Sequence, residues 1–244
     1  MTSEPLKYLF RRLGAWDDLS EEERAALVEA AGETKVMPRG SEIVREGQSP
    51  SFCTLLVGGM VAREKSLEEG GKQITAIHIA GDLIDLHTFL LSKLDHDLVA
   101  LTEVKLISFP HRKLKAITEQ LPHLTRLLWL STLIDSAIHR QWLVAMGRTS
   151  ALAHAAHFFC EIYVRSDLVG LADEHRSIPF AITQQQLADT LGLSAVHVSR
   201  VVQELRRQNL ITWDGKRLSV LDWDGLQSLG QFDPSFLDVV VRRR

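Results

Sequence analysis

Residues 183–205, TQQQLADTLGLSAVHVSRVVQEL, predict two short helices separated by a turn. Thr183 and Gln186 have the spacing of a capping box, in which each residue bonds to the backbone of the other, so a helix is expected to begin between them. Gly192 falls where the chain must turn through a left-handed conformation, which glycine adopts without strain. Ser194 is placed to cap the second helix. This arrangement is that of a helix-turn-helix.

The side chains of this stretch divide into an inner and an outer set. Ala188 is expected where the two helices cross, because a larger side chain there would push them apart. The residues predicted to share one core are Leu187, Leu191, Leu193, Val198, Val201, Val202 and Leu205. The residues left to face outward on the second helix are Ala195, Val196, His197, Ser199, Arg200 and Gln203. The second helix is therefore apolar on one side only.

An outward polar face at this position predicts contact with double-stranded DNA through a recognition helix at residues 195–207. In a helix-turn-helix, the N-terminal end of the second helix enters the major groove. Arg200 has the fork to bond guanine O6 and N7, Gln203 or His197 would contact further base edges, and Ala195 or Val196 would meet a thymine methyl. The residues expected on phosphates are Thr183, Gln185, Ser194 and Lys216. The alternative is an ordinary helical hairpin with a solvated face.

The rest of the chain predicts an α+β protein with three parts and a short extension. Residues 209–223, NLITWDGKRLSVLDW, alternate around an Asp-Gly turn and predict a hairpin, which makes residues 148–226 a winged helix. Between residues 34 and 110, short Ile-, Val- and Leu-rich runs alternate with Gly-rich turns, which predicts an antiparallel β jelly roll. Residues 1–118 are assigned to that roll with N-terminal helices, of which one is expected to begin with a capping box at Ser20 and Glu23.

Residues 119–147 predict a long helix followed by a hinge. Its apolar stripe comprises Leu124, Leu127, Leu128, Ile134, Ile138 and Trp142. A stripe of this length needs a partner surface, so we expect a twofold dimer here, with packing onto the roll as the alternative. Residues 227–244 form a C-terminal extension, expected to pack through Phe232 and Phe236 and to end in a basic tip.

Composition limits the function classes. The 244 residues are 45% hydrophobic and 24% charged with a net charge of −3, which fits a globular protein and does not by itself indicate nucleic acid. No apolar run has membrane-spanning length and the N-terminus lacks a signal-like apolar segment, so a cytoplasmic location without membrane contact is expected. The motifs G-x-S-x-G, H-E-x-x-H and G-x-G-x-x-G are missing, so we expect no enzyme and assign no catalytic residue.

On these residues the chain resembles the Crp/Fnr family of bacterial transcription regulators over nearly its whole length. The order of a cyclic-nucleotide-binding-like roll, a long dimerisation helix and a winged helix matches, most strongly in ITQQQLADTLGLSAVHVSRVVQELRRQNLI. The resemblance implies a homodimer that binds a pseudo-palindromic operator and contacts RNA polymerase. It does not carry over an operator sequence, because Ala195 and Val196 stand where familiar members have a polar base-reading pair.

The effector side departs from the family's cyclic-AMP binders. The residues aligned with the phosphate-holding Gly-Glu and Arg-Ser pairs are Asp85 and Leu86, then His96 and Asp97. Carboxylates there would repel a cyclic phosphate, so the effector is expected not to be cyclic AMP. The family's iron–sulfur branch needs four cysteines, and Cys53 and Cys160 are two. The small-molecule effector and any cofactor, haem included, stay unknown.

Three smaller features leave alternatives open. The segment DLIDLHTFLLSKLDHDLVA, with His87 and Asp95 among its polar residues, is either an effector pocket for a metal or cationic ligand or a solvated loop with one or two satisfied core histidines. No metal is assigned to it, and the first alternative would make the protein a ligand- or metal-sensing regulator that needs its effector to bind DNA. His154 and His157 are spaced to chelate but also to pack. The two cysteines are redox switches if exposed and inert if buried. The rival function is an effector-binding or interaction protein whose helix-turn-helix contacts protein rather than DNA.

Overall fold

The computed structural model describes residues 4–68 and 70–239, and they form two compact units. The first unit contains residues 4–63 and 77–136, together with 238–239. The second contains residues 64–68, 70–76 and 137–237. Each unit is described by itself below. No helix within the described ranges has the length and apolar character needed to cross a membrane.

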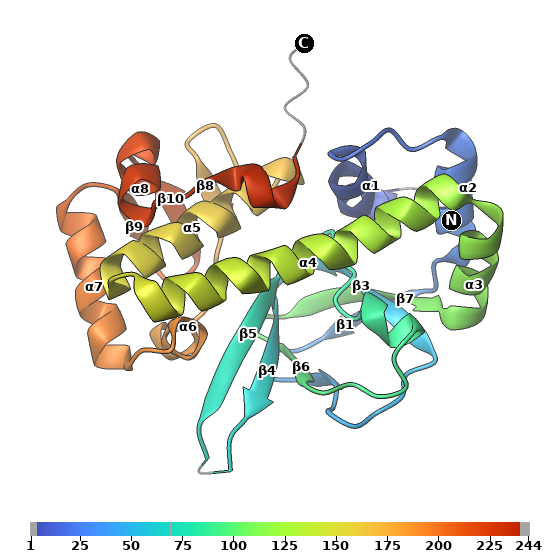
Figure 1. Ribbon diagram of the computed structural model, residues 1–244, viewed down its shortest axis with the longest axis horizontal. Coiled ribbons are helices and arrows are strands. Elements are labelled where there is room, and N and C mark those ends of the chain that lie inside the picture. The colour runs from blue at the N-terminus through green and yellow to red at the C-terminus, as the bar shows by residue number, and fades with distance from the viewer. Residues whose placement is uncertain (1–3, 69, 240–244) are drawn as a thin grey trace. The chain divides into compact units, whose positions relative to one another are not determined.

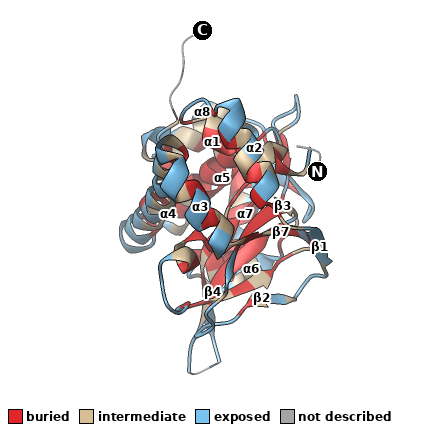
Figure 2. Ribbon diagram, turned by 90° about the vertical axis from the view of Figure 1, so that its right-hand side faces the viewer, coloured by how far each residue is buried: buried red, intermediate tan, exposed pale blue. Residues whose placement is uncertain are grey.

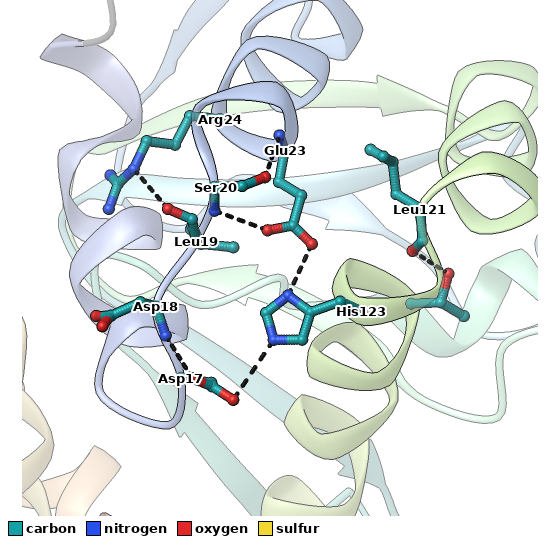
Figure 3. Close-up of polar contacts among 9 residues, drawn as sticks. Asp17, Asp18, Leu19, Ser20, Glu23, Arg24, Leu121 and His123 are labelled. Atoms are coloured by element: carbon teal, nitrogen blue, oxygen red, sulfur yellow. Dashed lines mark hydrogen bonds and ion pairs between the residues drawn. The ribbon is translucent and has the colours of Figure 1, made fainter.

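The first unit opens with three short helical segments, η1 (Glu4–Leu6), α1 (Lys7–Gly14) and α2 (Glu21–Ala30). The predicted capping box at α2 is confirmed, because Glu23 N donates to Ser20 Oγ and Ser20 N donates to the Glu23 carboxylate. The Glu23 carboxylate also contacts His123 Nδ1 at 2.8 Å, and Asp17 lies 3.6 Å from the other ring nitrogen of His123 (Figure 3). His123 thereby ties the start of the long helix to the N-terminal helices.

The predicted roll consists of two sheets (Figure 1). One sheet has the order β1-β7-β3, formed by Thr34–Met37, Val104–Pro110 and Phe52–Gly58. The other has the order β2-β6-β4-β5, formed by Glu42–Val44, Asp97–Ala100, Val61–Ser66 and Lys72–His78. The residues between them that build one hydrophobic cluster are Val44, Leu56, Val61, Ile84, Leu94, Leu98, Ala100, Val104 and Leu106. Buried residues run along β3 and β7 in Figure 2. The predicted α+β roll is confirmed.

The short helix η2 (Leu86–Phe89) follows the roll's fifth strand, and α3 (His111–Gln120) and α4 (Pro122–Arg148) follow its last. The stripe predicted to face a second copy is buried within the chain itself, each of its residues being at most 7% exposed. The exposed apolar side chains of α4 are instead Trp129, Leu133, Leu143, Val144 and Met146. This corrects the predicted dimer residues. The apolar pattern in the sequence therefore identifies the face of α4 that packs against other parts of the same chain.

The second unit is a three-stranded sheet surrounded by helices. Its helices are α5 (Ala151–Leu168), α6 (Gln184–Leu191), α7 (Ala195–Arg207) and α8 (Trp223–Gly230), followed by η3 (Pro234–Leu237). The sheet has the order β8-β10-β9, formed by Ser177–Pro179, Arg217–Val220 and Ile211–Trp213. The hairpin of β9 and β10 is the predicted wing. The sequence does not predict the strand β8, because three residues carry too little periodicity to be recognised.

Aromatic side chains fill the centre of the second unit. Phe159 and Phe180 pack edge to face with ring centroids 6.0 Å apart, and Trp213 lies 5.6 Å from Phe180. Trp213 also donates from Nε1 to the Phe180 carbonyl, so its one polar atom is satisfied. These contacts join α5, the segment before α6 and the wing into one core.

The C-terminal extension packs against α5. The ring of His157 packs against those of Phe232 and Phe236, with ring centroids 5.1 Å and 6.0 Å away. Gly230 approaches the His157 backbone so closely that an added Cβ would lie 2.6 Å from His157 N, which requires glycine there. The two phenylalanines therefore pack in the way the sequence predicts. The basic tip, residues 242–244, lies outside the described residues.

A buried charge network joins the end of α4 to α5. The Glu161 side chain is fully buried, accepts from Trp142 Nε1 at 2.6 Å and pairs with Arg165 at 2.8 Å. A buried carboxylate is stable in such a site only when its oxygens are paired. The contact therefore fixes where the last turns of α4 lie on α5.

Candidate nucleic-acid interface

The turn between α6 and α7 has the geometry that its sequence predicts. Thr183 caps α6 in a reciprocal box with Gln186. Gly192 ends α6 with φ of 65° and ψ of 34°, the left-handed conformation that favours glycine. Ser194 then accepts from His197 N and caps α7. The first backbone N–H groups of both helices are thus ordered by local side chains, which fixes the two helix N-termini.

The two faces of α7 have opposite character. Val198, Val201, Val202 and Leu205 are at most 5% exposed. Ala188 on α6 is fully buried beneath them, which fits its predicted place at the helix crossing. The N-terminal outward face carries the exposed His197, Arg200 and Gln203, the partly exposed Ala195 and Ser199, and Val196, which is 65% exposed. Val196 is apolar and yet exposed, which suits a contact with another molecule.

The residues expected on phosphates lie at the N-termini of α6 and α7, on α6 itself and in the wing turn. Thr183, Gln185, Ser194 and Lys216 are all exposed. The hydroxyl groups of Thr183 and Ser194 are occupied as helix caps. A phosphate at either place would therefore be bound by the N-terminus of the helix rather than by a free hydroxyl. Gln185 bonds Asp189 within α6 at 2.7 Å, which holds its amide on the helix surface.

The wing presents Lys216 from a tight turn. Asp214 accepts from the backbone N–H groups of Lys216 and Arg217, both at 2.8 Å, and Gly215 has a φ of 86°. These hydrogen bonds lower the pKa of Asp214, so its carboxylate stays ionised while it holds the turn. The Lys216 side chain is exposed beyond it.

The predicted effector residues of the first unit separate into two groups. Asp85 is fully buried and accepts from both Thr54 N and Thr54 Oγ1, while Asp97 accepts from Glu46 N. Burial raises the pKa of Asp85 to about 7, against the opposing effect of the Thr54 hydrogen bonds. Leu86 is buried as well. These three side chains serve the roll's own structure.

The two histidines of the predicted pocket do come together. The rings of His87 and His96 are 5.2 Å apart, and burial lowers the pKa of both, that of His87 to about 4. His96 Nδ1 contacts Asp95 Oδ1 at 2.7 Å, so the exposed Asp95 carboxylate orients the His96 ring. The Nε2 atoms of both rings are buried, and neither has a hydrogen-bond partner within the described residues.

His78 and Arg63 belong with this pair, and sequence reasoning missed them. The Nε2 atom of His78 is likewise buried and unbonded within the described residues, and the buried Arg63 pairs with Asp135 at 2.9 Å. The positive charge of Arg63 also helps to lower the pKa values of His78, His87 and His96. Alternation along the strands would have found both, because His78 follows Ile74 and Ala76 on one face of β5 and Arg63 follows Val61 on β4.

The remaining candidate side chains, those of His154 and the two cysteines, are buried. Among the described residues, no three His, Cys, Asp or Glu side chains are grouped to hold a metal ion. His154 is buried, and burial lowers its pKa to about 4. Cys53 and Cys160 are fully buried, and burial raises the pKa of each thiol to about 12. Thiols that stay protonated are poor nucleophiles and redox sensors.

Comparison with known proteins agrees with this architecture. Residues 34–120 match the cyclic nucleotide-binding domain family, and residues 154–229 match the Crp-like helix-turn-helix domain family. The chain is 24% identical over 180 residues to the transcriptional activator protein FnrL of Cereibacter sphaeroides, covering 73% of this chain and 72% of that protein. It is 27% identical over 197 residues to the nitrogen fixation regulation protein FixK of Azorhizobium caulinodans, covering 81% and 78%. The structure of FixK2 from Bradyrhizobium japonicum has the same fold, with a TM-score of 0.73, 22% identity and coverage of 81% and 96%.

A cyclic-nucleotide-binding-type roll followed by a Crp-like winged helix is the arrangement of DNA-binding transcription regulators. The chain belongs to the Crp/Fnr family of transcription regulators.

Proposed function

We propose that the protein is a cytoplasmic, non-catalytic homodimer that binds a pseudo-palindromic operator and acts on transcription through RNA polymerase. The observation that carries the proposal is the outward N-terminal face of α7, held in place by two capped helix ends and a left-handed glycine. Each copy would place α7 in a major groove, with half-sites about one helical turn apart. The relatives FnrL and FixK are named as regulators, which supports a role in transcription.

Within this face, Arg200 is the proposed base reader of greatest weight. It is exposed, and a guanidinium can donate two parallel bonds to guanine, worth about 1–3 kcal/mol against the wrong base. Val196 would pack on a thymine methyl, with Ala195 beside it. His197, Ser199 and Gln203 would complete the base contacts. Gln185 and Lys216, with the N-termini capped by Thr183 and Ser194, would position the duplex by its phosphates.

The test begins with selection of operator sequences from a random duplex pool by the purified protein, without added ligand. Recovery of a palindrome is expected. Arg200→Ala should then weaken operator binding by about 5- to 150-fold and relax the preference at one base pair in each half-site. Lys216→Ala should weaken binding to all sequences alike and reduce the salt dependence by about one unit of slope.

Two outcomes would contradict this assignment. Equal and small effects of both variants on any duplex would favour the rival, in which the helix-turn-helix contacts protein. Weak, sequence-indifferent binding by the wild type that becomes specific when cell-extract metabolites are added would show a regulator that depends on its effector.

Dimerisation would use the exposed face of α4 rather than the predicted stripe. Trp129, Leu133 and Leu143 are 65%, 50% and 72% exposed, and they follow one another at spacings of 4 and 10 residues. Positions that repeat in steps of 4 and 3 form the seam along which two helices pack as a coiled coil. The same register places Ser136, Arg140 and Gly147 on the seam, and all three are exposed.

Leu143→Glu tests the seam, with Leu90→Glu as a matched control because Leu90 is an exposed leucine of the roll, at 85%. Sedimentation should show a monomer for Leu143→Glu and a dimer for the control. Loss of the second binding module should weaken operator binding by about 100-fold or more. A Leu143→Glu protein that remains a dimer would contradict the proposed seam.

The proposed effector is not cyclic AMP. The carboxylates of Asp85 and Asp97 are bonded to the roll's backbone, and the neighbouring Arg63 is paired with Asp135. The cation described beside these carboxylates, Arg63, is thus already paired, whereas a cyclic phosphate requires a cation of its own. Titration calorimetry with cyclic AMP should give no heat of binding, and saturable binding in the micromolar range would contradict the proposal.

A further inference from the structure

A hollow of about 480 Å³ lies on the wing of the second unit, apart from the outward face of α7. It is lined by Ser177, Arg206, Thr212, Trp213, Asp214, Arg217 and Ser219. The strand pairing explains its chemistry, because Ser219 on β10 lies opposite Ser177 on one side and opposite Thr212 on the other. Three hydroxyl side chains thus cross the face of the sheet that is turned away from Leu218 and the aromatic core.

The two arginines of the hollow retain donors for a further group. Arg217 donates from Nε to Ser177 Oγ at 2.8 Å, and from Nη2 to the Ser177 carbonyl and to Asp173. None of these bonds uses its Nη1 group. Arg206 donates to the Trp213 carbonyl and has no carboxylate partner among the described residues. The lining carries two guanidinium groups and the carboxylate of Asp214, which is committed to the wing turn. Asp173 pairs with Arg217 at 2.6 Å, so the guanidinium of Arg206 is the lining cation without a carboxylate partner among the described residues.

This set of groups suits a phosphate. Guanidinium groups bind phosphate oxygens with parallel hydrogen bonds, and serine and threonine hydroxyls are common further donors. An open hollow, rather than an enclosed one, suits a phosphate that belongs to a larger molecule.

We propose that this hollow is a phosphate subsite that takes a backbone phosphate of the DNA flanking each half-site. The inference rests on the proposed function. The proposed function places Lys216 on a phosphate. Lys216 stands in the turn between Asp214 and Arg217, and both of these residues line the hollow, so the hollow is next to the wing turn. The hollow is lined by wing residues and by Arg206 from the last turn of α7, at the opposite end of that helix from its outward N-terminal face. Its phosphate would therefore belong to DNA outside the bases that the N-terminal face contacts. The subsite therefore adds affinity without sequence preference.

The test uses Arg206→Gln in the full-length protein. Glutamine keeps an N–H for the Trp213 carbonyl while removing the charge, so the wing should still fold. The matched control is Arg207→Gln, one residue further along α7, because Arg207 pairs with Glu204 and does not line the hollow. Each protein is titrated with two duplexes, one ending at the outer edges of the selected half-sites and one extended by ten base pairs on both sides, over a range of salt.

Wild-type protein is expected to bind the extended duplex more tightly than the short one. Arg206→Gln should lose about 3- to 10-fold in affinity for the extended duplex, with the salt slope reduced by about one, and should bind the short duplex like wild type. Arg207→Gln should stay within about twofold of wild type on both duplexes.

Three results would overturn the subsite. Equal losses in the two variants would show a general charge effect, and a loss by Arg206→Gln on the short duplex would place Arg206 inside the half-site. If 10 mM inorganic phosphate shifts the amide resonances of the hollow in wild type but duplex length has no effect, the phosphate comes from a small molecule. Failure of the proposed function is distinguishable, because wild type would then show no preference for the selected operator on either duplex.

Discussion

The helix-turn-helix and the roll place their polar groups on opposite sides of their folds. On α6 and α7 the polar side chains other than that of the buried Thr190 are at least partly exposed, and the buried apolar residues are Ala188 and branched aliphatic residues. In the roll, Arg63, His78, Asp85 and His96 are each at most 7% exposed. In the first region the exposed polar groups are accessible to a partner. The second stores polar groups inside, where each must be paired or kept neutral.

This contrast indicates how each region responds to change. A substitution on the outside of α7 should alter binding and leave folding nearly untouched. A substitution of a polar residue in the roll should alter stability and its dependence on pH. The predictions below test that division, beginning with the largest expected effect.

Asp85→Asn should change how stability varies with pH. Because burial raises the pKa of Asp85 from 3.8 to about 7, the folded state retains a proton that the unfolded state has lost. The stability it contributes is therefore present below pH 3.8 and is lost as pH rises toward 7. The interval corresponds to at most about 4 kcal/mol.

Asparagine still accepts from Thr54 N but does not ionise. The stability of the variant relative to wild type should thus rise between pH 5 and pH 8, as measured by urea unfolding at both values. All other titrating groups are present in both proteins, so their effects cancel in the comparison. If the stability difference between the variant and wild type is the same at both pH values, Asp85 does not have the raised pKa that its burial indicates.

Ala188→Leu and Ala195→Leu apply one substitution to the two sides of the motif. Ala188 is fully buried, so the larger side chain should cost about 1–3 kcal/mol of unfolding free energy by separating the helices. Ala195 is partly exposed on the outward face, so its variant should keep wild-type stability within about 0.5 kcal/mol while changing operator preference. Equal thermal destabilisation in the two variants would remove the distinction between an inner and an outer face.

Ser194→Ala should have the smallest effect, about 1 kcal/mol, because the cap of α7 is lost without disturbing its core. Ser194→Asp should restore the cap but place a negative charge at a helix end proposed to meet phosphate. Stability should therefore recover in the aspartate variant while DNA affinity, measured by fluorescence anisotropy, falls further. Recovery of both would indicate that this helix end does not approach the DNA.

The sequence predicts the motif better than the sensor interior, for a physical reason. Thr183, Gly192 and Ser194 act on their own neighbours in the chain, so local spacing determines their roles. The environment of His78 depends on strands distant in sequence, and one strand's alternation does not say what the facing strand brings. The apolar residues of α4 illustrate the same limit. The helix is apolar on more than one side, and periodicity alone does not indicate which side the chain itself covers.

The one-sided apolar stripe of α7 has an evolutionary consequence. The four residues that anchor the helix and the six that face outward share no position, so mutations that retarget the regulator need not pass through unfolded intermediates. Neutral drift at Ala195, Val196 and His197 would then generate paralogues with new operators on an unchanged scaffold. A gene duplicated from this one would be free to acquire a separate regulon before losing its ability to fold.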